Sequence, residues 1–413
     1  MPPIETRDDL IAALHEASEI EHGLLLQYLF AALSLKQRPD EELAPEQFVL
    51  LRQWKGVILG IAVDEMGHLG TVCNLLAAVG AAPHFERPGF PQPTGYYPFP
   101  FELVRFSDEA LERFVTAELP RGGSTADCLG NPSLAPVRAR AALVDLVPEV
   151  PVYKYVGELY EQIKAGIKAI PEPQLFIGSP TRQVDNNWSI NVDMRVITDR
   201  ASALEAIDDI VRDGEGTPSR RADSHFGRFC QVWRAYRAAP FDAARPVVRN
   251  PRTRPPRAAA AGAAAAGASI TMITDPTALA VAELFNAAYA VMLRLLAQFF
   301  ANAGESDAQR DAIRSASARL MSTAIRPIAE VLTSLPATPG GKETAGPSFE
   351  LYLPVMVPPE LGNRWLMLFE ELDQVIAAAG QLGRAGALGR LAHIADTLGI
   401  MKQSLQVAAR SDA

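Results

Sequence analysis

Apolar residues at helical spacing dominate the first part of the chain. They recur three or four positions apart over residues 6–36 and again over residues 45–79. Pro45 suits the first turn of the second stretch, while Gly80 and Pro83 mark its end. The pattern predicts two long helices joined by a short loop, which is one antiparallel half of a four-helix bundle.

The next part of the chain is less regular. Residues 83–150 contain many prolines, which remove backbone donors and prevent continuous helix, so we expect a long irregular insertion there. Within it, Ser107 is placed to cap a short helix over 107–118. The elements expected afterwards are a third bundle helix over 152–170, a strand over 188–192, and a fourth helix over 202–213 and 218–239 that is broken between these parts.

A change in composition divides the chain in two. Residues 244–269 pass from an Arg- and Pro-rich stretch into alanine-rich low complexity, which is typical of a linker. The predicted domains are therefore a helical bundle at 1–243 and a C-terminal helical domain at 270–413. Helices are expected in the second domain over 276–302, 307–334, 358–382 and 385–410. The predicted fold class is all-α.

Charge and cysteine content narrow the function classes. The chain has 39 basic and 48 acidic residues, a net charge of -9, which argues against a nucleic-acid partner. Three cysteines, Cys73, Cys128 and Cys230, are too few and too scattered for a disulfide framework, which indicates a reducing compartment. The N-terminus lacks the pattern of a signal peptide, and no apolar run is expected to span a membrane. We therefore expect a soluble, cytoplasmic protein.

The sharpest chemical signal is the pair Glu65 and His68. Residues three apart on a helix lie on one face, so this carboxylate and imidazole can reach a single metal ion. The pair interrupts an otherwise apolar helix, where unpaired polar groups cost several kcal/mol, so we expect metal or hydrogen bonds to satisfy it. A hydrogen-bonded pair without metal is the alternative.

Three further predicted helices carry polar residues among apolar neighbours. They are Glu21 on the first helix, Glu158 on the third and His225 on the fourth. Bundles that hold two iron ions use one Glu from each of two helices and a Glu-x-x-His from each of the others. The fourth helix departs from this pattern, because Ala222 stands three residues before His225. The candidates to complete the site are Glu215, which lies in the break, Asp223 and Glu161.

Other polar and aromatic residues give a weaker indication of metal binding. Glu118, close before Pro120, is expected to cap or brace the bundle rather than bind metal. Tyr28 and Tyr160 are interpreted as core aromatics.

Several of these motifs together resemble the ferritin-like domain of the iminophenyl-pyruvate dimer synthase family. That family includes the violacein- and rebeccamycin-pathway enzymes that oxidatively couple tryptophan-derived imines. The resemblance covers roughly residues 6–240. The segments that carry it are Ile20-Glu21-His22, Gln27-Tyr28-Leu29, Asp64-Glu65-Met66-Gly67-His68-Leu69, Asn74-Leu75-Leu76-Ala77-Ala78-Val79-Gly80, Val156-Gly157-Glu158-Leu159-Tyr160, Asp213-Gly214-Glu215-Gly216 and Ser224-His225-Phe226.

The resemblance implies a metal centre and a class of chemistry. The ligand set it implies is Glu21, Glu65, His68, Glu158, Glu215 and His225. It would hold two iron ions, with manganese as the alternative. The leading hypothesis is an oxidase or oxygenase that acts with dioxygen on a small organic substrate. The alternatives are a non-catalytic iron-binding protein, or a structural protein whose C-terminal helices form a homodimer. The substrate, the reaction, the number of metal ions and the oligomeric state stay open.

Overall fold

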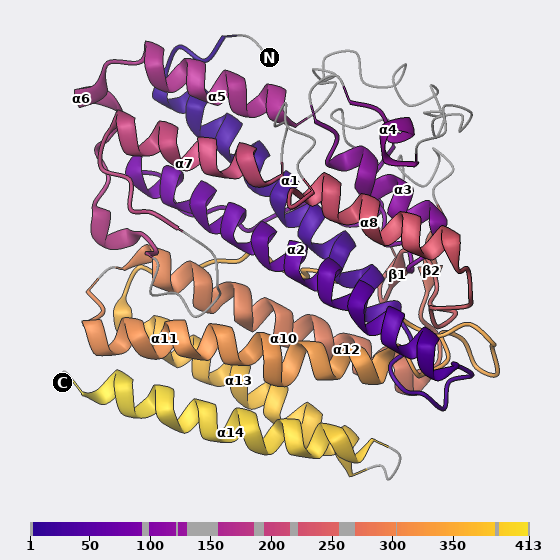
Figure 1. Ribbon diagram of the computed structural model, residues 1–413. Coiled ribbons are helices and arrows are strands. Elements are labelled where there is room, and N and C mark those ends of the chain that lie inside the picture. Colours follow the sequence, from indigo (N-terminus) through magenta and orange to yellow (C-terminus); the bar gives the residue numbers. More distant parts are fainter. Residues whose placement is uncertain are drawn as a thin grey trace.

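The structure, a computed structural model, is mostly helical (Figure 1). It describes residues 3–92, 99–120, 123–129, 156–185, 194–214, 222–255, 269–302, 304–384 and 388–411. The N-terminal elements are α1 (Arg7–Ser34), α2 (Pro45–Ala78), α3 (Asp108–Ala117), α4 (Thr125–Leu129), α5 (Gly157–Ala169), α6 (Glu172–Leu175), η2 (Pro180–Arg182), α7 (Arg200–Asp213) and α8 (His225–Ala238). Next come β1 (Pro251–Arg252), β2 (Thr271–Met272), α10 (Pro276–Ala301), α11 (Asp307–Leu320), η4 (Met321–Ile325), α12 (Arg326–Leu332), α13 (Leu361–Gly383) and α14 (Gly389–Arg410).

The two long helices α1 and α2 pack along their length as the predicted hairpin. The other two positions of the bundle are each filled by two shorter helices. Helix α1 contacts both α5 and α3, and α2 contacts both α7 and α8. Figure 1 shows α7 and α8 following one another along the bundle. The bundle is therefore built from two continuous and two interrupted helices.

Local chemistry sets the ends of the hairpin helices. Thr6 caps α1, where its hydroxyl accepts from Asp9 N while the Asp9 carboxylate accepts from Thr6 N. Beyond the end of α2, Gly80 has φ +82°, a left-handed conformation that favours glycine. Ala81 N then donates to Leu76 O, which satisfies a carbonyl of the last turn. The end of α2 at Gly80 is the one predicted from the sequence.

Three predicted elements are shifted, divided or outside the described residues. The fourth bundle helix was expected to resume at residue 218, but α8 begins at His225, because Ser224 accepts from Gly227 N and so caps the helix there. The strand predicted over 188–192 lies outside the described residues. The helix predicted over 307–334 is present as α11, η4 and α12, with a π-helical turn before Pro327 that accommodates the proline.

The C-terminal helices pack as a second layered group beside α1 and α2 (Figure 1). Helix α10 contacts α11, α12 and α13, and α14 lies against α11 and α13. Tyr289 of α10 places its hydroxyl 2.5 Å from His22 Nε2 of α1. Residues 244–255 are held against the bundle, since Arg245 N donates to Ser34 O and Asn250 N to Leu103 O. The division into domains at 244–269 stays a prediction.

Helices α2 and α10 are long and apolar enough to cross a membrane by length and composition, contrary to the expectation that no segment would be. Their most apolar windows are 56% and 67% buried inside the protein. Both lie largely in the core of the helical fold, in which a packed helix needs apolar residues on several faces.

Two of the three cysteines form a disulfide, which the sequence analysis did not expect. Cys128 and Cys230 are 102 residues apart in sequence, but their Cα atoms lie 5.2 Å apart because α4 packs on α8. Cys73 is free and buried. The scattered spacing of the cysteines indicated no disulfide framework, but Cys128 and Cys230 do pair, because tertiary packing and not spacing brings them together.

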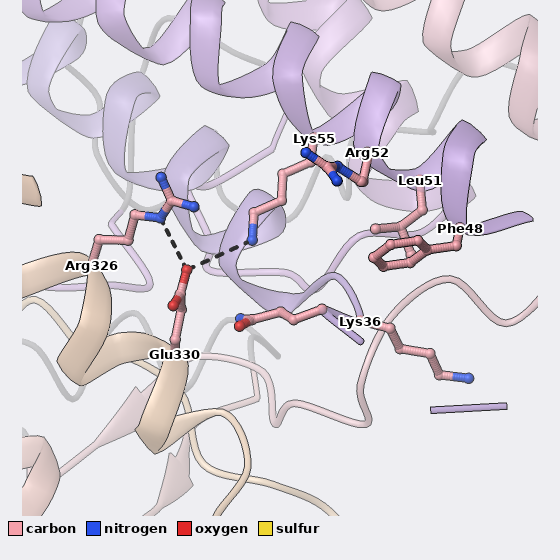
Figure 2. A pocket seen from close by; sticks show the side chains of 8 residues that line it. Lys36, Phe48, Leu51, Arg52, Lys55, Arg326 and Glu330 are labelled. Carbon is pink, nitrogen blue, oxygen red and sulfur yellow. Dashed lines mark hydrogen bonds and ion pairs between the residues drawn. The ribbon is translucent and has the colours of Figure 1, made fainter. Parts of the chain in front are cut away.

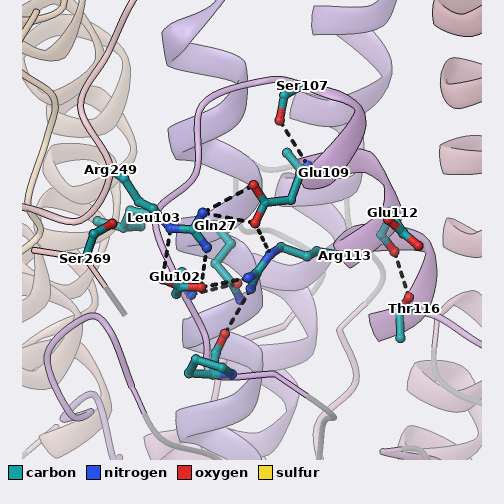
Figure 3. A network of polar contacts seen from close by, with 12 residues as sticks. Gln27, Glu102, Leu103, Ser107, Glu109, Glu112, Arg113, Thr116, Arg249 and Ser269 are labelled. Carbon is teal, nitrogen blue, oxygen red and sulfur yellow. Dashed lines mark hydrogen bonds and ion pairs between the residues drawn. The ribbon is translucent and has the colours of Figure 1, made fainter. Parts of the chain in front are cut away.

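A buried ionic network fixes α3 against α1 and the segment after α8 (Figure 3). Glu102 accepts from Arg113 Nη2 at 2.7 Å and from Arg249 Nε at 2.9 Å. Its backbone N donates to the side chain of Gln27 on α1. Loss of one partner would leave a buried charge unpaired, which is strongly destabilising. The network therefore keeps α3 in one position against its neighbours.

Candidate metal centre

Five polar side chains meet in the middle of the bundle, where the interrupted helices end or begin. Helix α1 supplies one carboxylate, α2 a carboxylate and an imidazole, the C-cap of α3 a carboxylate, and the first residue of α8 an imidazole. All are at most 4% exposed. These residues, named here the carboxylate–histidine cluster, are Glu21, Glu65, His68, Glu118 and His225.

Glu65 lies at the centre of the cluster and contacts both imidazoles. Its Oε2 is 3.0 Å from His68 Nδ1, and its Oε1 is 3.0 Å from His225 Nδ1. The outer carboxylates flank this arrangement, with Glu21 Oε2 3.6 Å from His68 Nδ1 and Glu118 Oε2 3.5 Å from His225 Nδ1. The cluster therefore consists of two carboxylate–imidazole pairs, Glu21 with His68 and Glu118 with His225, that share Glu65.

Each outer carboxylate is oriented by a tyrosine. Tyr160 donates to Glu21 Oε1, and Tyr28 donates to Glu118 Oε1. Both tyrosine side chains are fully buried. One oxygen of each carboxylate is thus fixed from outside, which leaves the Oε2 atoms directed at the histidines.

Groups around the cluster also hold His225 in place. Asp64 Oδ2 is 3.4 Å from His225 Nε2 and accepts from Arg228 Nη1 at 2.5 Å. An outer carboxylate of this kind orients a ring whose other nitrogen binds metal. At the end of α7, a Cβ on Gly214 would lie 2.8 Å from His225 Nδ1 and 3.1 Å from Glu118 Oε2. Only a glycine lets the backbone pass so close.

The donor set fits a metal centre. Several buried polar atoms of the cluster have no hydrogen-bond partner among the described residues, and such atoms cost about 1–3 kcal/mol each. Carboxylate oxygens and imidazole nitrogens are ligands that suit iron and manganese. Glu65, His68 and His225 each offer a ligand atom within 4.8 Å of the others. The atoms without a hydrogen bond are Glu21 Oε2, Glu65 Oε1, Glu118 Oε2, His68 Nε2 and both ring nitrogens of His225, although all except His68 Nε2 make an ionic contact within the cluster or with Asp64.

The electrostatics of the cluster favour a bound cation. Burial raises the pKa of Glu65 to about 7, against the lowering effect of the imidazoles beside it. Burial alone would lower the pKa of His68, but Glu65 and Glu21 outweigh it and raise this pKa to about 10. The pKa of His225 is likewise held well above its usual value by Glu118 and Glu65, despite burial. The three carboxylates thus keep both imidazoles protonated, and therefore positively charged.

A model of the ferritin-like family matches residues 14–234, which include every member of the cluster. The chain belongs to the ferritin-like family. A solved structure described as a ferritin-like protein from Caulobacter vibrioides aligns with 84% of this chain and all of its own, at 21% identity and a TM-score of 0.52. This likeness supports the fold.

Two curated relatives confirm the resemblance found in the sequence. The chain is 31% identical over 393 residues to a dichlorochromopyrrolate synthase of Lentzea aerocolonigenes, an alignment that covers 84% of this chain and 36% of that protein. It is 30% identical over 374 residues to a 2-imino-3-(indol-3-yl)propanoate dimerase of Chromobacterium violaceum, covering 83% of this chain and 34% of that protein. The chain thus spans about a third of the length of both relatives.

The structure brings together four of the six predicted ligands of this ferritin-like site, namely Glu21, Glu65, His68 and His225. Glu158 is half-buried in the first turn of α5, and its role stays a prediction. Glu215 lies outside the described residues. The fallback candidates Asp223 and Glu161 are both exposed.

Sequence reasoning ranked Glu118 as a cap or brace, and the structure adds it to the cluster. Glu118 is the C-cap of α3, as expected, but its side chain points inward to His225 and Tyr28. Tyr28 and Tyr160 are core aromatics, as expected, yet their hydroxyls also bond the outer carboxylates. A sequence signal existed in part, since Gln27-Tyr28 and Glu158-Leu159-Tyr160 lie within the motifs that carry the family resemblance.

Proposed function

We propose that the chain is a di-metal oxidase or oxygenase of a small organic substrate, with two iron ions in the carboxylate–histidine cluster. The observation that carries the proposal is the pair of carboxylate–imidazole units that share Glu65. The proposed ligands are Glu21, Glu65, His68, Glu118 and His225, with Glu158 and Glu215 as the further ligands expected from the sequence. Manganese is the alternative metal.

Two ferrous ions held by these residues would supply electrons for the reduction of dioxygen, and the residues of the chain would control where this happens. The cluster lies among fully buried side chains, which exclude bulk water. The hydroxyls of Tyr28 and Tyr160 donate hydrogen bonds to Glu118 Oε1 and Glu21 Oε1. The Oε2 atom of each carboxylate therefore stays directed at the histidines of the cluster. Asp64 fixes the ring of His225 from behind.

The class of substrate is proposed from the relatives. The names of the two curated relatives describe enzymes that act on small organic molecules, one of them 2-imino-3-(indol-3-yl)propanoate. Because this chain spans about a third of those proteins, the proposal extends to oxidation of a small organic molecule and leaves the product open. The cytoplasm is the proposed compartment and a homodimer the proposed assembly, to be tested by cell fractionation and sedimentation.

Metal analysis tests the proposal. Protein purified without added metal is loaded anaerobically with ferrous iron, analysed, and then exposed to oxygen while its absorbance is recorded. We expect two irons per chain and a transient change in absorbance. Glu65→Ala and His68→Ala should each abolish binding, whereas Glu46→Ala, on the exposed first turn of α2, should not.

The other outcomes distinguish the alternative functions. Iron uptake far beyond two per chain would indicate storage, and no binding at all would leave a structural role. Full metal occupancy in both Glu65→Ala and His68→Ala would contradict the site assignment.

A further inference from the structure

A cavity lies away from the carboxylate–histidine cluster, between the start of α2, the end of α1 and helix α12 (Figure 2). Its volume is about 310 Å³, at the lower end of the range for small-molecule sites. Lys55, on its wall, precedes Glu65 of the cluster by ten residues on α2. Ten helical residues rise about 15 Å, so this cavity is separate from the proposed metal centre.

Cations dominate the lining of this cavity. Lys36, Arg52, Lys55 and Arg326 line it, and one carboxylate, Glu330, faces them. Asp242 pairs with Lys36 at 3.1 Å, which still leaves the cavity with two more positive than negative side chains. This local excess stands in a chain whose net charge is -9. A concave site of one sign attracts ligands of the opposite sign.

Several of these cations have N–H donors that form no hydrogen bond with a described residue. Lys55 Nζ lies 4.0 Å from Glu330 and makes no hydrogen bond within the described part of the chain. Arg326 bonds Glu330 through Nε at 2.9 Å, and we find no partner among the described residues for its two Nη atoms. Arg52, which is exposed, forms no ion pair with any described residue. Figure 2 shows Lys55 and Arg326 converging on Glu330 from opposite sides.

One wall of the cavity is apolar. Phe48 and Leu51 lie next to each other on α2, as Figure 2 shows. Phe48 lies one turn before Arg52, and Leu51 lies one turn before Lys55. Phe48 is only half-buried although it is a large aromatic. Apolar walls with a few directed polar groups are typical of sites for small organic molecules.

We propose that this cavity binds a small organic anion, with its carboxylate or phosphate group on Arg52, Lys55 and Arg326 and its apolar body on Phe48 and Leu51. Planar guanidinium groups suit both kinds of oxyanion because they can donate two parallel hydrogen bonds. The inference does not depend on the metal centre.

Calorimetric titration with simple probes tests the site. The probes are 3-phenylpropanoate for a carboxylate, phenyl phosphate for a phosphate, 3-phenylpropan-1-ol for the body without charge, and inorganic phosphate for the charge without a body. We expect one of the first two to bind once per chain, and the last two to bind at least about tenfold more weakly. The stronger of the first two identifies the head group.

Substitutions locate the bound probe. Arg52→Gln breaks no ion pair among the described residues, and Lys55→Met leaves Glu330 paired with Arg326 and Arg390, so both should fold. Each should raise the Kd about tenfold or more without changing the metal content. Arg319→Gln, an exposed arginine on α11, is the matched control and should leave the Kd unchanged. An unchanged Kd in both cavity variants, equal affinity for the neutral alcohol, or no binding of either anionic probe would overturn the proposal.

Discussion

Tyr28 on α1 donates its phenolic hydrogen to Glu118 Oε1, across 2.5 Å, at the point where α3 ends. No histidine stands three residues after Glu118 in the sequence. The bond from Tyr28 holds one oxygen of its carboxylate and leaves the other directed at His225. The same relationship recurs on the other side of the cluster, where Tyr160 donates to Glu21. The inner oxygens of both outer carboxylates are therefore set by tyrosines on neighbouring helices.

Tyr28→Phe removes this bond while keeping the ring that packs on Phe114 and Phe229. Loss of a group that orients a metal ligand typically weakens metal affinity about 10–100-fold, and we expect a fall in this range. Competition with a chromogenic chelator measures it. Tyr236→Phe, at an aromatic on α8 that packs edge-to-face with Trp54 and Phe106, is the control. Equal affinity in the wild type and Tyr28→Phe would show that the bond has no role in positioning.

Gly214→Ala tests how closely the end of α7 approaches the cluster. A methyl group there would meet His225 Nδ1 at 2.8 Å and Glu118 Oε2 at 3.1 Å, so one of these two side chains must move. We expect the variant to fold and to lose at least one of two bound metal ions, as measured by elemental analysis. Gly56→Ala on α2, where a Cβ meets nothing within 4 Å, should keep both. Full occupancy in Gly214→Ala would contradict a ligand role for the Glu118–His225 pair.

The hairpin and half of the site could be predicted because local signals define them. Pro45 and Gly80 mark the two ends of the second helix in sequence, and the structure places the ends of α2 there. Glu65 and His68 share a face because of helical spacing alone, so their proximity required no knowledge of tertiary structure.

The remainder of the site depends on contacts that no local pattern records. Glu118 reaches His225 because α3 packs on α8 across more than a hundred residues of sequence. The Cys128–Cys230 pair arises from the packing of α4 on α8. The expected start of α8 was wrong because the helical pattern of the sequence runs through Ser224, whereas in the structure the Ser224 side chain accepts from Gly227 N and caps the start of α8.

Metal binding should release protons. Without metal, the pKa of His68 is raised to about 10 and that of His225 lies well above its usual value, so both imidazoles are protonated at neutral pH. A metal ligand must be deprotonated, and Glu65, whose pKa is raised to about 7, is partly protonated as well, so between about two and three protons should leave per chain at pH 7. Affinity should then rise with pH up to about 10, because protons compete with the metal. Calorimetry in two buffers with different ionisation heats measures the number released.

The apo protein should respond to pH in the opposite direction. A pKa raised in the folded state, as for His68, contributes stability below the unfolded value near 6.5, and this stability is lost as the pH rises toward 10. Metal-free protein should therefore melt at lower temperature at pH 9 than at pH 7, while loaded protein should not. His68→Gln should lower the number of protons released by about one. A binding heat that does not depend on the buffer would refute the linkage.

Reduction of the Cys128–Cys230 disulfide should lower stability without emptying the metal centre. The bond closes a loop with a sequence separation of 102 residues, and loss of a native disulfide typically costs about 2–5 kcal/mol. Helix α8 keeps other anchors, because Trp233 Nε1 and Arg237 still donate to Asp108 of α3. His225 at its first turn should therefore stay in place. Chemical denaturation and metal analysis, with and without a thiol reductant, measure the two effects separately. In Cys230→Ser the reductant should cause no further loss of stability, and loss of metal on reduction of the wild type would show that the disulfide supports the centre directly.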